Sequence, residues 1–227
     1  VYEDVWTNVI IVVGENLSFY IDGKLSFSFK SPSYTTTSVT RQAFYLGRPD
    51  SDTSQTEIDY GQFSILDYAL NLEQVKTIYN NGYDFDYTNL QSSLVFHSEQ
   101  QPQPEPEPSG LKLLHYVNFI QGLNDKVGSN KKMNATLISG SNRTAQLLPD
   151  FGVRLTHPDT TMTDSNDKGF IKLDSVKIPK GEKTIQFWIK TYDLVGENYN
   201  FISFTDSPVP DENIDLERLI DSLKNSK

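Results

Sequence analysis

Two stretches of alternating apolar and hydroxyl-bearing residues flank an Asp-Gly pair near the start of the chain. The stretch Leu17–Ile21 reads LSFYI, the stretch Leu25–Phe29 reads LSFSF, and Asp22-Gly23 lies between them. Alternation with a period of two indicates strands, and an Asp-Gly pair between two such runs is a strong hairpin signal. One face of this hairpin is apolar and the other carries hydroxyl groups, as in a sheet that covers a core on one side. The pattern therefore predicts an antiparallel, all-β fold.

The same signals recur through most of the chain. Alternating or fully apolar runs predict further strands at Val9–Val13, Arg41–Leu46, Ile58–Leu66, Ser93–His97, Leu111–Phe119, Ala135–Ile138, Val153–Leu155, Phe170–Leu173, Thr184–Lys190 and Asn200–Phe204. In the TIQFWIK run, we expect the side chains of Ile185, Phe187 and Ile189 to face one way and those of Gln186 and Trp188 the other. Many short strands of this kind predict a sandwich of two packed sheets.

Two segments show helical instead of strand periodicity. In Asn71–Asn81 the apolar residues recur every three to four positions, Asn71 can cap the first turn, and Gly82 can take the left-handed conformation after the last. Asp211–Leu223 has an amphipathic pattern with acidic residues in its first turn. We therefore expect one or two short helices beside the sheets.

A proline-rich segment interrupts the strand signals near the middle of the chain. Ser98–Ser109 reads SEQQPQPEPEPS, and its alternating prolines exclude a helix or a central strand. The segment predicts an extended spacer of roughly 37 Å, at about 3.1 Å per residue for polyproline II. It divides the chain into residues 1–97 and residues 110–227, which together are the size of one sandwich.

Two sets of motifs, one on each side of the spacer, carry a resemblance to a known family. The first set is WTNVIIVVGENLSFYIDGKL (Trp6–Leu25), FYLGR (Phe44–Arg48) and YGQFSILDYALNLEQVKTIYNNGY (Tyr60–Tyr83). The second set lies at Leu111–Asn130, Phe151–Leu155, Phe170–Leu173 and Thr184–Thr191. The first set resembles the C-terminal half, and the second the N-terminal half, of a laminin G-like, concanavalin A-like domain. The resemblance implies an antiparallel jelly-roll sandwich whose halves occur in exchanged order.

Two arrangements explain the exchanged order. In a circular permutant, the spacer joins the old chain ends within one domain. In a series of tandem repeats, residues 110–227 complete their sandwich with the equivalent of residues 1–97 from a neighbouring copy. The terminal strands of such jelly rolls lie side by side, about 4.8 Å apart. A spacer much longer than that distance favours the tandem repeat.

Composition excludes several classes of function. The formal net charge of −10 opposes binding to nucleic acid or to an anionic membrane. No apolar run approaches the length of about 18 residues that a membrane-spanning helix requires. The chain has no Cys, which excludes disulfides, a thiol nucleophile and thiolate metal ligands. It begins at Val1 and shows no signal peptide, so we expect a piece of a longer protein.

Three N-glycosylation sequons point to the secretory route. They begin at Asn16, Asn134 and Asn142. Chance occurrence is the alternative, because the chain is rich in Asn, Ser and Thr. With occupied sequons, we expect an extracellular or cell-surface glycoprotein.

The stretch QTEIDYGQFSIL places Glu57 and Asp59 on one face of an expected strand, with the spacing of catalytic acids in jelly-roll β-glucanases. A retaining glycosidase needs two carboxyl groups about 5–5.5 Å apart. The third position here is Gly61, or Gln62 if a bulge shifts the register. Neither residue can donate and recover a proton, so we expect no catalysis. We interpret Glu57 and Asp59 as the solvated start of a strand.

Calcium is a second candidate ligand, because the resemblance implies Ca²⁺ at acidic loop residues. The candidate metal ligands are Asp125, Asp164, Asp167 and Asp206. They form no regular calcium-binding motif, and solvated loop acids are the favoured alternative. The three histidines, His97, His115 and His157, lack the short spacing of metal ligands.

Exposed aromatic rings are a third candidate site, since they could stack on sugars. The candidates for carbohydrate binding are Tyr34, Tyr45, Tyr60, Trp188, Tyr192 and Tyr199. Packing within the sandwich is the alternative for each of them, and the sequence leaves the choice open.

These observations favour a non-catalytic extracellular structural repeat. We expect its sandwiches to assemble, through proline-rich linkers and contacts with adjacent copies, into a fibre, a stalk or a surface coat. A glycan-binding adhesion module, with or without Ca²⁺, is the second hypothesis, and a degenerate β-glucanase-like domain is the third. No cofactor other than Ca²⁺ is implied.

Overall fold

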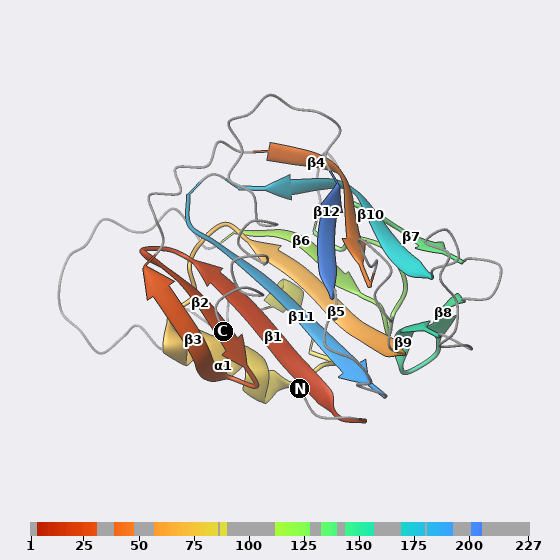
Figure 1. The fold of residues 1–227 in the computed structure, drawn as a ribbon, viewed down its shortest axis with the longest axis horizontal. Helices are drawn as coiled ribbons and strands as arrows, with labels where there is room; N and C mark the ends of the chain where they lie inside the picture. The colour runs from red at the N-terminus through yellow and green to blue at the C-terminus, as the bar shows by residue number, and fades with distance from the viewer. Residues whose placement is uncertain are drawn as a thin grey trace.

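The computed structural model describes residues 4–30, 39–47, 57–85, 87–89, 112–127, 133–139, 144–156, 169–179, 181–192 and 201–205. These residues form an antiparallel β-sandwich with one α-helix (Figure 1). The all-β prediction is therefore confirmed at the level of a sandwich of antiparallel sheets. The expected strand at Ser93–His97, the spacer and the expected helix at Asp211–Leu223 lie outside the described residues.

The larger sheet has eight strands and the smaller has four. The larger sheet runs in the order β3 (Lys24–Lys30), β2 (Asn16–Ile21), β1 (Trp6–Val13), β11 (Lys183–Thr191), β5 (Ile58–Leu66), β9 (Gly152–Leu155) and β8 (Ala145–Leu148), and β6 (Leu113–Asn118) also pairs with β5. The smaller sheet runs in the order β12 (Ile202–Thr205), β4 (Val39–Leu46), β10 (Phe170–Ile178) and β7 (Asn134–Ile138). Every pairing is antiparallel, including the predicted hairpin of β2 and β3.

The main core lies between the two sheets. Its fully buried side chains include Phe44 and Leu46 of β4 and Phe63 of β5. The Phe44 and Phe63 rings pack edge to face, with their centroids 5.2 Å apart. The three apolar residues of the TIQFWIK run also enter this core, whereas Gln186 and Trp188 face away from it, as predicted. Alternation thus places successive residues of β11 on opposite faces of the large sheet.

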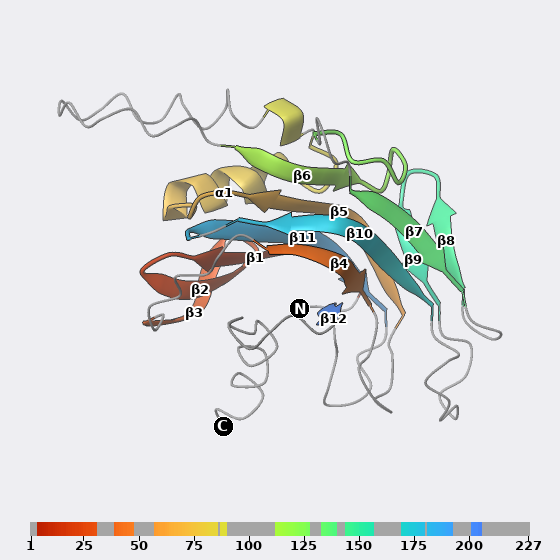
Figure 2. The ribbon, with the colours of Figure 1, turned by 90° about the horizontal axis from the view of Figure 1, so that it is seen from above.

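A second, smaller core lies on the outer face of the large sheet, under helix α1 (Leu72–Asn81). In Figure 2, α1 lies on one side of the large sheet and β12 on the other. Val75 and Ile78 of the helix are fully buried against this face. Asn71 accepts a bond from the backbone of Gln74, whose side chain accepts one from the backbone of Asn71, and Gly82 ends the helix with a φ of 83°. The Asn71 cap is confirmed, and Gly82 has the expected positive φ, although its ψ of 177° is extended instead of left-handed helical.

Both sheets contain strands from each side of the spacer. The pairings β1–β11, β5–β6, β5–β9, β5–β11, β4–β10 and β4–β12 each join a strand before residue 97 to one after residue 110. Among the described strands, the central β5, β4, β10 and β11 all pair across the division.

Two features of the smaller strands escaped the sequence patterns. The strand β8 was not predicted, because its AQLL sequence is short and does not alternate. The strand β10 continues beyond the predicted end at Leu173 to Ile178. The alternation is broken at Ser175, whose backbone φ is 62°, but Val176 and Ile178 beyond it still enter the main core. A single 3₁₀ turn, η1 (Tyr87–Asn89), lies beside β6.

Candidate functional site

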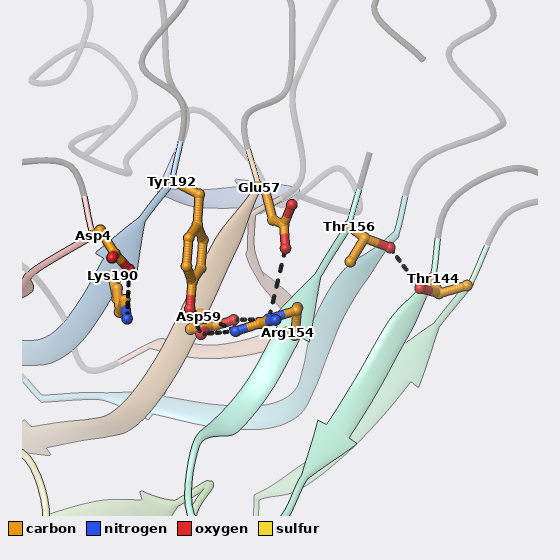
Figure 3. A network of polar contacts seen from close by, with 8 residues as sticks. All are labelled: Asp4, Glu57, Asp59, Thr144, Arg154, Thr156, Lys190 and Tyr192. Atoms are coloured by element: carbon orange, nitrogen blue, oxygen red, sulfur yellow. Dashed lines mark hydrogen bonds and ion pairs between the residues drawn. The ribbon is translucent and has the colours of Figure 1, made fainter. Parts of the chain in front are cut away.

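The outer face of the large sheet carries a cluster of charged side chains beyond the region that α1 covers. In the strand register, Asp59 of β5 lies opposite Lys190 of β11 on one side and opposite Arg154 of β9 on the other. Tyr192 follows β11, and its backbone N–H donates to the carbonyl of Glu57. Figure 3 shows these side chains pointing toward one another across the three strands.

Asp59 is the centre of this charged cluster, and its side chain is completely buried. Arg154 donates from Nε to Oδ1 at 2.8 Å and from Nη2 to Oδ2 at 2.9 Å, and the Tyr192 hydroxyl donates to Oδ2 at 2.5 Å. Such a two-pronged Arg–carboxylate pair is among the strongest hydrogen-bonded contacts in proteins. The expectation that Asp59 is solvated is therefore wrong, because a cation from a strand 95 residues away covers it.

The other members of the cluster hold fixed charges around the Tyr192 ring. The Arg154 guanidinium and the Lys190 ammonium lie 4.7 Å and 4.9 Å from the ring centroid. Hydrogen bonding to Asp59 raises the pKa of Arg154, and hydrogen bonding to Asp4, at 2.7 Å, raises the pKa of Lys190. Burial first, and then the neighbouring Asp59, raises the pKa of Tyr192. These three groups keep their ordinary charge states at neutral pH, so none of them is tuned to exchange a proton there.

The third position of the supposed catalytic triplet holds no carboxyl group. The pairing of β5 with β11 shifts register between Trp188 and Ile189, which makes Gly61 a bulge and turns Gln62 to the outer face. The Gln62 amide donates to the carbonyl of Phe85 at 2.7 Å. A Cβ on Gly61 would lie 3.2 Å from the Trp6 indole, so this ring occupies the space beside the bulge. Of the two alternatives for the third position, Gly61 and Gln62, the bulged register therefore places Gln62 there.

Glu57, the other acid of the pair, is about one-third exposed and lies 3.7 Å from Nε of Arg154. Its nearest described charge is thus the same guanidinium that binds Asp59. The two acids share one cation, and the arrangement can hold β5, β9 and the end of β11 together. It offers no free carboxylic acid beside a free carboxylate, which two-carboxylate hydrolysis requires.

Asp125 forms a second polar contact, with His115 of β6. His115 Nδ1 and Asp125 Oδ2 are 2.8 Å apart, and both side chains are nearly inaccessible. The backbone N–H of Lys177 in β10 donates to His115 Nε2 at 2.8 Å. Nε2 is therefore the acceptor and Nδ1 carries the proton that His115 donates to Asp125. This chain of bonds joins the two sheets through β6 and β10.

The Asp125 carboxylate also accepts three backbone bonds, from Tyr116, Val127 and Met133. Burial acts to raise the pKa of Asp125, but these bonds and that from His115 outweigh it and hold the pKa below its usual value. The expected solvated side chain is wrong for Asp125, and its oxygens are occupied by protein donors. The other metal candidates, Asp164, Asp167 and Asp206, lie outside the described residues, as do His97 and His157. Within the described segments, no group of three or more acidic or histidine side chains is placed to hold a metal.

The aromatic candidates occupy three different environments. Tyr60 belongs to the main core and donates its hydroxyl proton to the carbonyl of Phe201 at 2.7 Å. Tyr45 is buried against Phe170. Trp188 is buried on the outer face of the large sheet, where Tyr79 of α1 stacks on it. Tyr192 alone of the described candidates is partly exposed. Tyr34 and Tyr199 lie outside the described residues.

The two described sequon asparagines have similar surroundings. Asn16 begins β2 and Asn134 begins β7, and both side chains are exposed. Asn142 lies outside the described residues.

Arg154 was not identified from the sequence, although a signal was present. In the run FGVRL, Val153 and Leu155 alternate with Arg154. Because the apolar pair enters the core, the arginine has to project from the outer face, which is also the face of Asp59. The pairing of β9 with β5, which makes them neighbours, is not visible in the sequence.

No helix in the described part of the chain is long and apolar enough to cross a membrane. Comparison with protein-family models, with curated protein sequences and with solved structures found no match.

Proposed function

We propose that the chain is a non-catalytic, extracellular structural module with a laminin G-like jelly-roll sandwich, in which residues 1–97 and 110–227 act as complementary halves. The halves complete one another within a chain or between adjacent copies of a longer repeat. Copies linked in this way through the proline-rich spacer would build a fibre, a stalk or a surface coat.

The observation that carries this proposal is the pairing of strands across the spacer. The central strand β5 has β11, β6 and β9 as its partners, and all three come from the second segment. A segment that lacks its counterpart exposes the apolar face of β5 and unpaired strand edges. Each half therefore gains a large free energy from any copy of the other half, and the covalent spacer decides which copy is reached.

The polar clusters support a structural role. The Asp59–Arg154 pair joins β5 of the first segment to β9 of the second. Protein donors saturate the Asp59 carboxylate. Such saturation stabilises the contact between the halves, whereas a catalytic nucleophile needs a carboxylate that is free to attack. The exposed sequon residues Asn16 and Asn134 are compatible with an extracellular location.

The free edge of the large sheet is a less suitable place for assembly. Lys24 and Lys30 lie at the two ends of the edge strand β3, and a bulge at Ser26 interrupts its regular pairing. Charged ends and bulges oppose edge-to-edge pairing of sheets. We therefore assign association between copies to exchange of halves and not to extension of the sheet.

A cleavable spacer tests the proposal. A protease site placed within residues 98–109 leaves both halves intact, and a scrambled site of the same length is the control. The protein is unfolded, refolded at low and high concentration, and sized by light scattering before and after cleavage. We expect oligomers whose proportion rises with concentration, and we expect cleavage to convert them to complexes of one copy of each half.

Two results would overturn the proposal. Oligomers that survive cleavage are held by surface contacts instead of exchanged halves. A chain that stays monomeric after refolding at high concentration closes only on itself, as a circular permutant does.

A further inference from the structure

A row of uncharged side chains crosses the outer face of the large sheet beside the charged cluster. In the strand register, Asn8 of β1 lies opposite Trp188 of β11, Trp188 opposite Gln62 of β5, and Gln62 opposite Asn118 of β6. Gln186, two residues before Trp188, lies on the same face. The four strands β1, β11, β5 and β6 thus bring four amide side chains around one indole.

These amides are buried and incompletely bonded. Asn8, Gln62 and Gln186 are inaccessible to solvent, and Asn118 is 1% exposed. The Asn8 Oδ1 and Nδ2, Gln62 Oε1, Gln186 Nε2 and Asn118 Nδ2 atoms find no hydrogen-bond partner among the described residues. Each buried polar group left without a partner costs about 1–3 kcal/mol. Five such atoms in one patch point to polar groups beyond those that the described residues supply.

Aromatic rings cover the amide row. Tyr79 stacks on Trp188 with a centroid separation of 6.0 Å, and Tyr83 stacks on Trp6 at 4.7 Å. Trp188 also donates from Nε1 toward the Tyr87 hydroxyl at 3.4 Å. Trp6, Tyr79 and Tyr83 are the partly exposed members, and Tyr83 directly follows Gly82 at the end of α1. Tyr79, at 36%, is the most exposed ring of this cover, and the partly exposed Tyr83 lies just beyond the end of α1.

The chemistry of this patch restricts its ligand. The unpaired atoms include both donors and acceptors, and a hydroxyl group can serve either kind. The row has no charged member, which disfavours an ion. Flat aromatic faces beside neutral amides suit a ring that carries hydroxyl groups on its rim and C–H groups on its face.

We propose that this patch, formed by Asn8, Gln62 and the rings around Trp188, binds one neutral hexopyranose unit of a glycan. The sugar displaces Tyr83 from Trp6, stacks on the aromatic cover and bonds through its hydroxyl groups to the unpaired amides. The proposal is independent of the exchange of halves, since all its residues contribute to one completed sandwich.

Tryptophan fluorescence gives a selective assay, because the chain has two tryptophans, Trp6 and Trp188, and both line the patch. The probes are the methyl glycosides of β-D-glucose, β-D-galactose and α-D-mannose, and N-acetylglucosamine. We expect a saturable change in emission with at least one of them. The variant Asn8→Leu removes two of the unpaired atoms, and we expect it to weaken that binding at least tenfold.

Two variants complete the design. Asn16→Leu alters an exposed asparagine on the neighbouring strand and should leave the fluorescence titration unchanged. If Asn8→Leu fails to fold, as judged by circular dichroism, Tyr83→Ala replaces it with the opposite expected result: because the sugar displaces this ring from Trp6, its removal should strengthen the binding, and unchanged binding overturns the proposal.

The outcomes separate a sugar site from buried water. Absence of a saturable change with all four probes overturns the proposal, and the amides then bond to water alone. A change of equal affinity in Asn8→Leu also overturns it, because the sugar then binds elsewhere. Loss of binding in Asn8→Leu, with a melting temperature equal to or above that of the parent protein, supports it.

Discussion

The Asp59–Arg154 pair allows a sharp test of how the two halves are held, because its partners are buried unequally. Asp59 is completely buried, whereas the Arg154 side chain remains 28% exposed. Arg154→Met leaves a buried carboxylate with the Tyr192 hydroxyl as its remaining donor. Removing one partner of a buried ion pair costs about 3–5 kcal/mol. Asp59→Leu instead leaves a guanidinium that can reach water and Glu57, and we expect a loss of about 1–2 kcal/mol.

The double variant Asp59→Leu with Arg154→Met makes the prediction specific. It removes the uncompensated buried charge, so we expect it to be more stable than Arg154→Met alone. Replacement of a buried ion pair by apolar side chains of similar volume is often close to neutral. The two losses should therefore be strongly non-additive, since the residues are in direct contact.

Urea unfolding at pH 7, followed by circular dichroism, measures the three free energies of unfolding. For a chain of this length, a loss of 3 kcal/mol lowers the melting temperature by roughly 6–12 °C. The reasoning is refuted if Arg154→Met is no more harmful than Asp59→Leu, or if the double variant loses the sum of the two. Either result would mean that the buried carboxylate does not depend on its cation.

Two further predictions concern the His115–Asp125 contact and the close approach of Gly152 to the backbone of Tyr60. Because the folded-state pKa of Asp125 is held below its usual value of 3.8, its stabilising effect is complete above that pH and disappears as the pH falls further. Asp125→Asn should therefore cost about 3 kcal/mol at pH 7, and urea titrations should show the gap to the parent protein narrowing as the pH falls below about 4; a gap of the same size at pH 2 as at pH 7 contradicts the account. Gly152→Ala places a Cβ 2.2 Å from the carbonyl oxygen of Tyr60, at a φ of 92°, and should destabilise by more than about 3 kcal/mol. Gly122→Ala, with a φ of 132° and no neighbour within 4 Å, is the matched control and should cost about 1 kcal/mol in thermal melts, so equal losses would rule out the steric explanation.

Local sequence patterns account for most of the architecture. Alternation predicted the hairpin of β2 and β3 and the inward-facing residues of β11, because residue period alone decides which side chains share a face of a strand. The caps of α1 were equally visible, since Asn71 and Gly82 act on backbone groups within a few residues. The weak points were β8 and the end of β10, where short length and the left-handed Ser175 removed the periodic signal.

The character of the polar sites depended on partners remote in sequence. Glu57 and Asp59 were visible as a pair of acids, but whether they meet water, a proton donor or a cation was decided when β9 brought Arg154 alongside β5. His115 likewise showed no metal-ligand spacing, and its role follows from Asp125 and the backbone of Lys177 in the other sheet.

The sequence by itself determined that the chain forms antiparallel strands with one apolar face, and a capped helix. Those properties follow from residue period, capping chemistry and composition, all of which act over a few residues. Only the tertiary structure decided that Asp59 is a buried ion-pair partner, that Gly61 lies beneath Trp6, and that four amides gather around Trp188. Strand order and register set these contacts, and both are fixed by the packing of distant segments on a shared core.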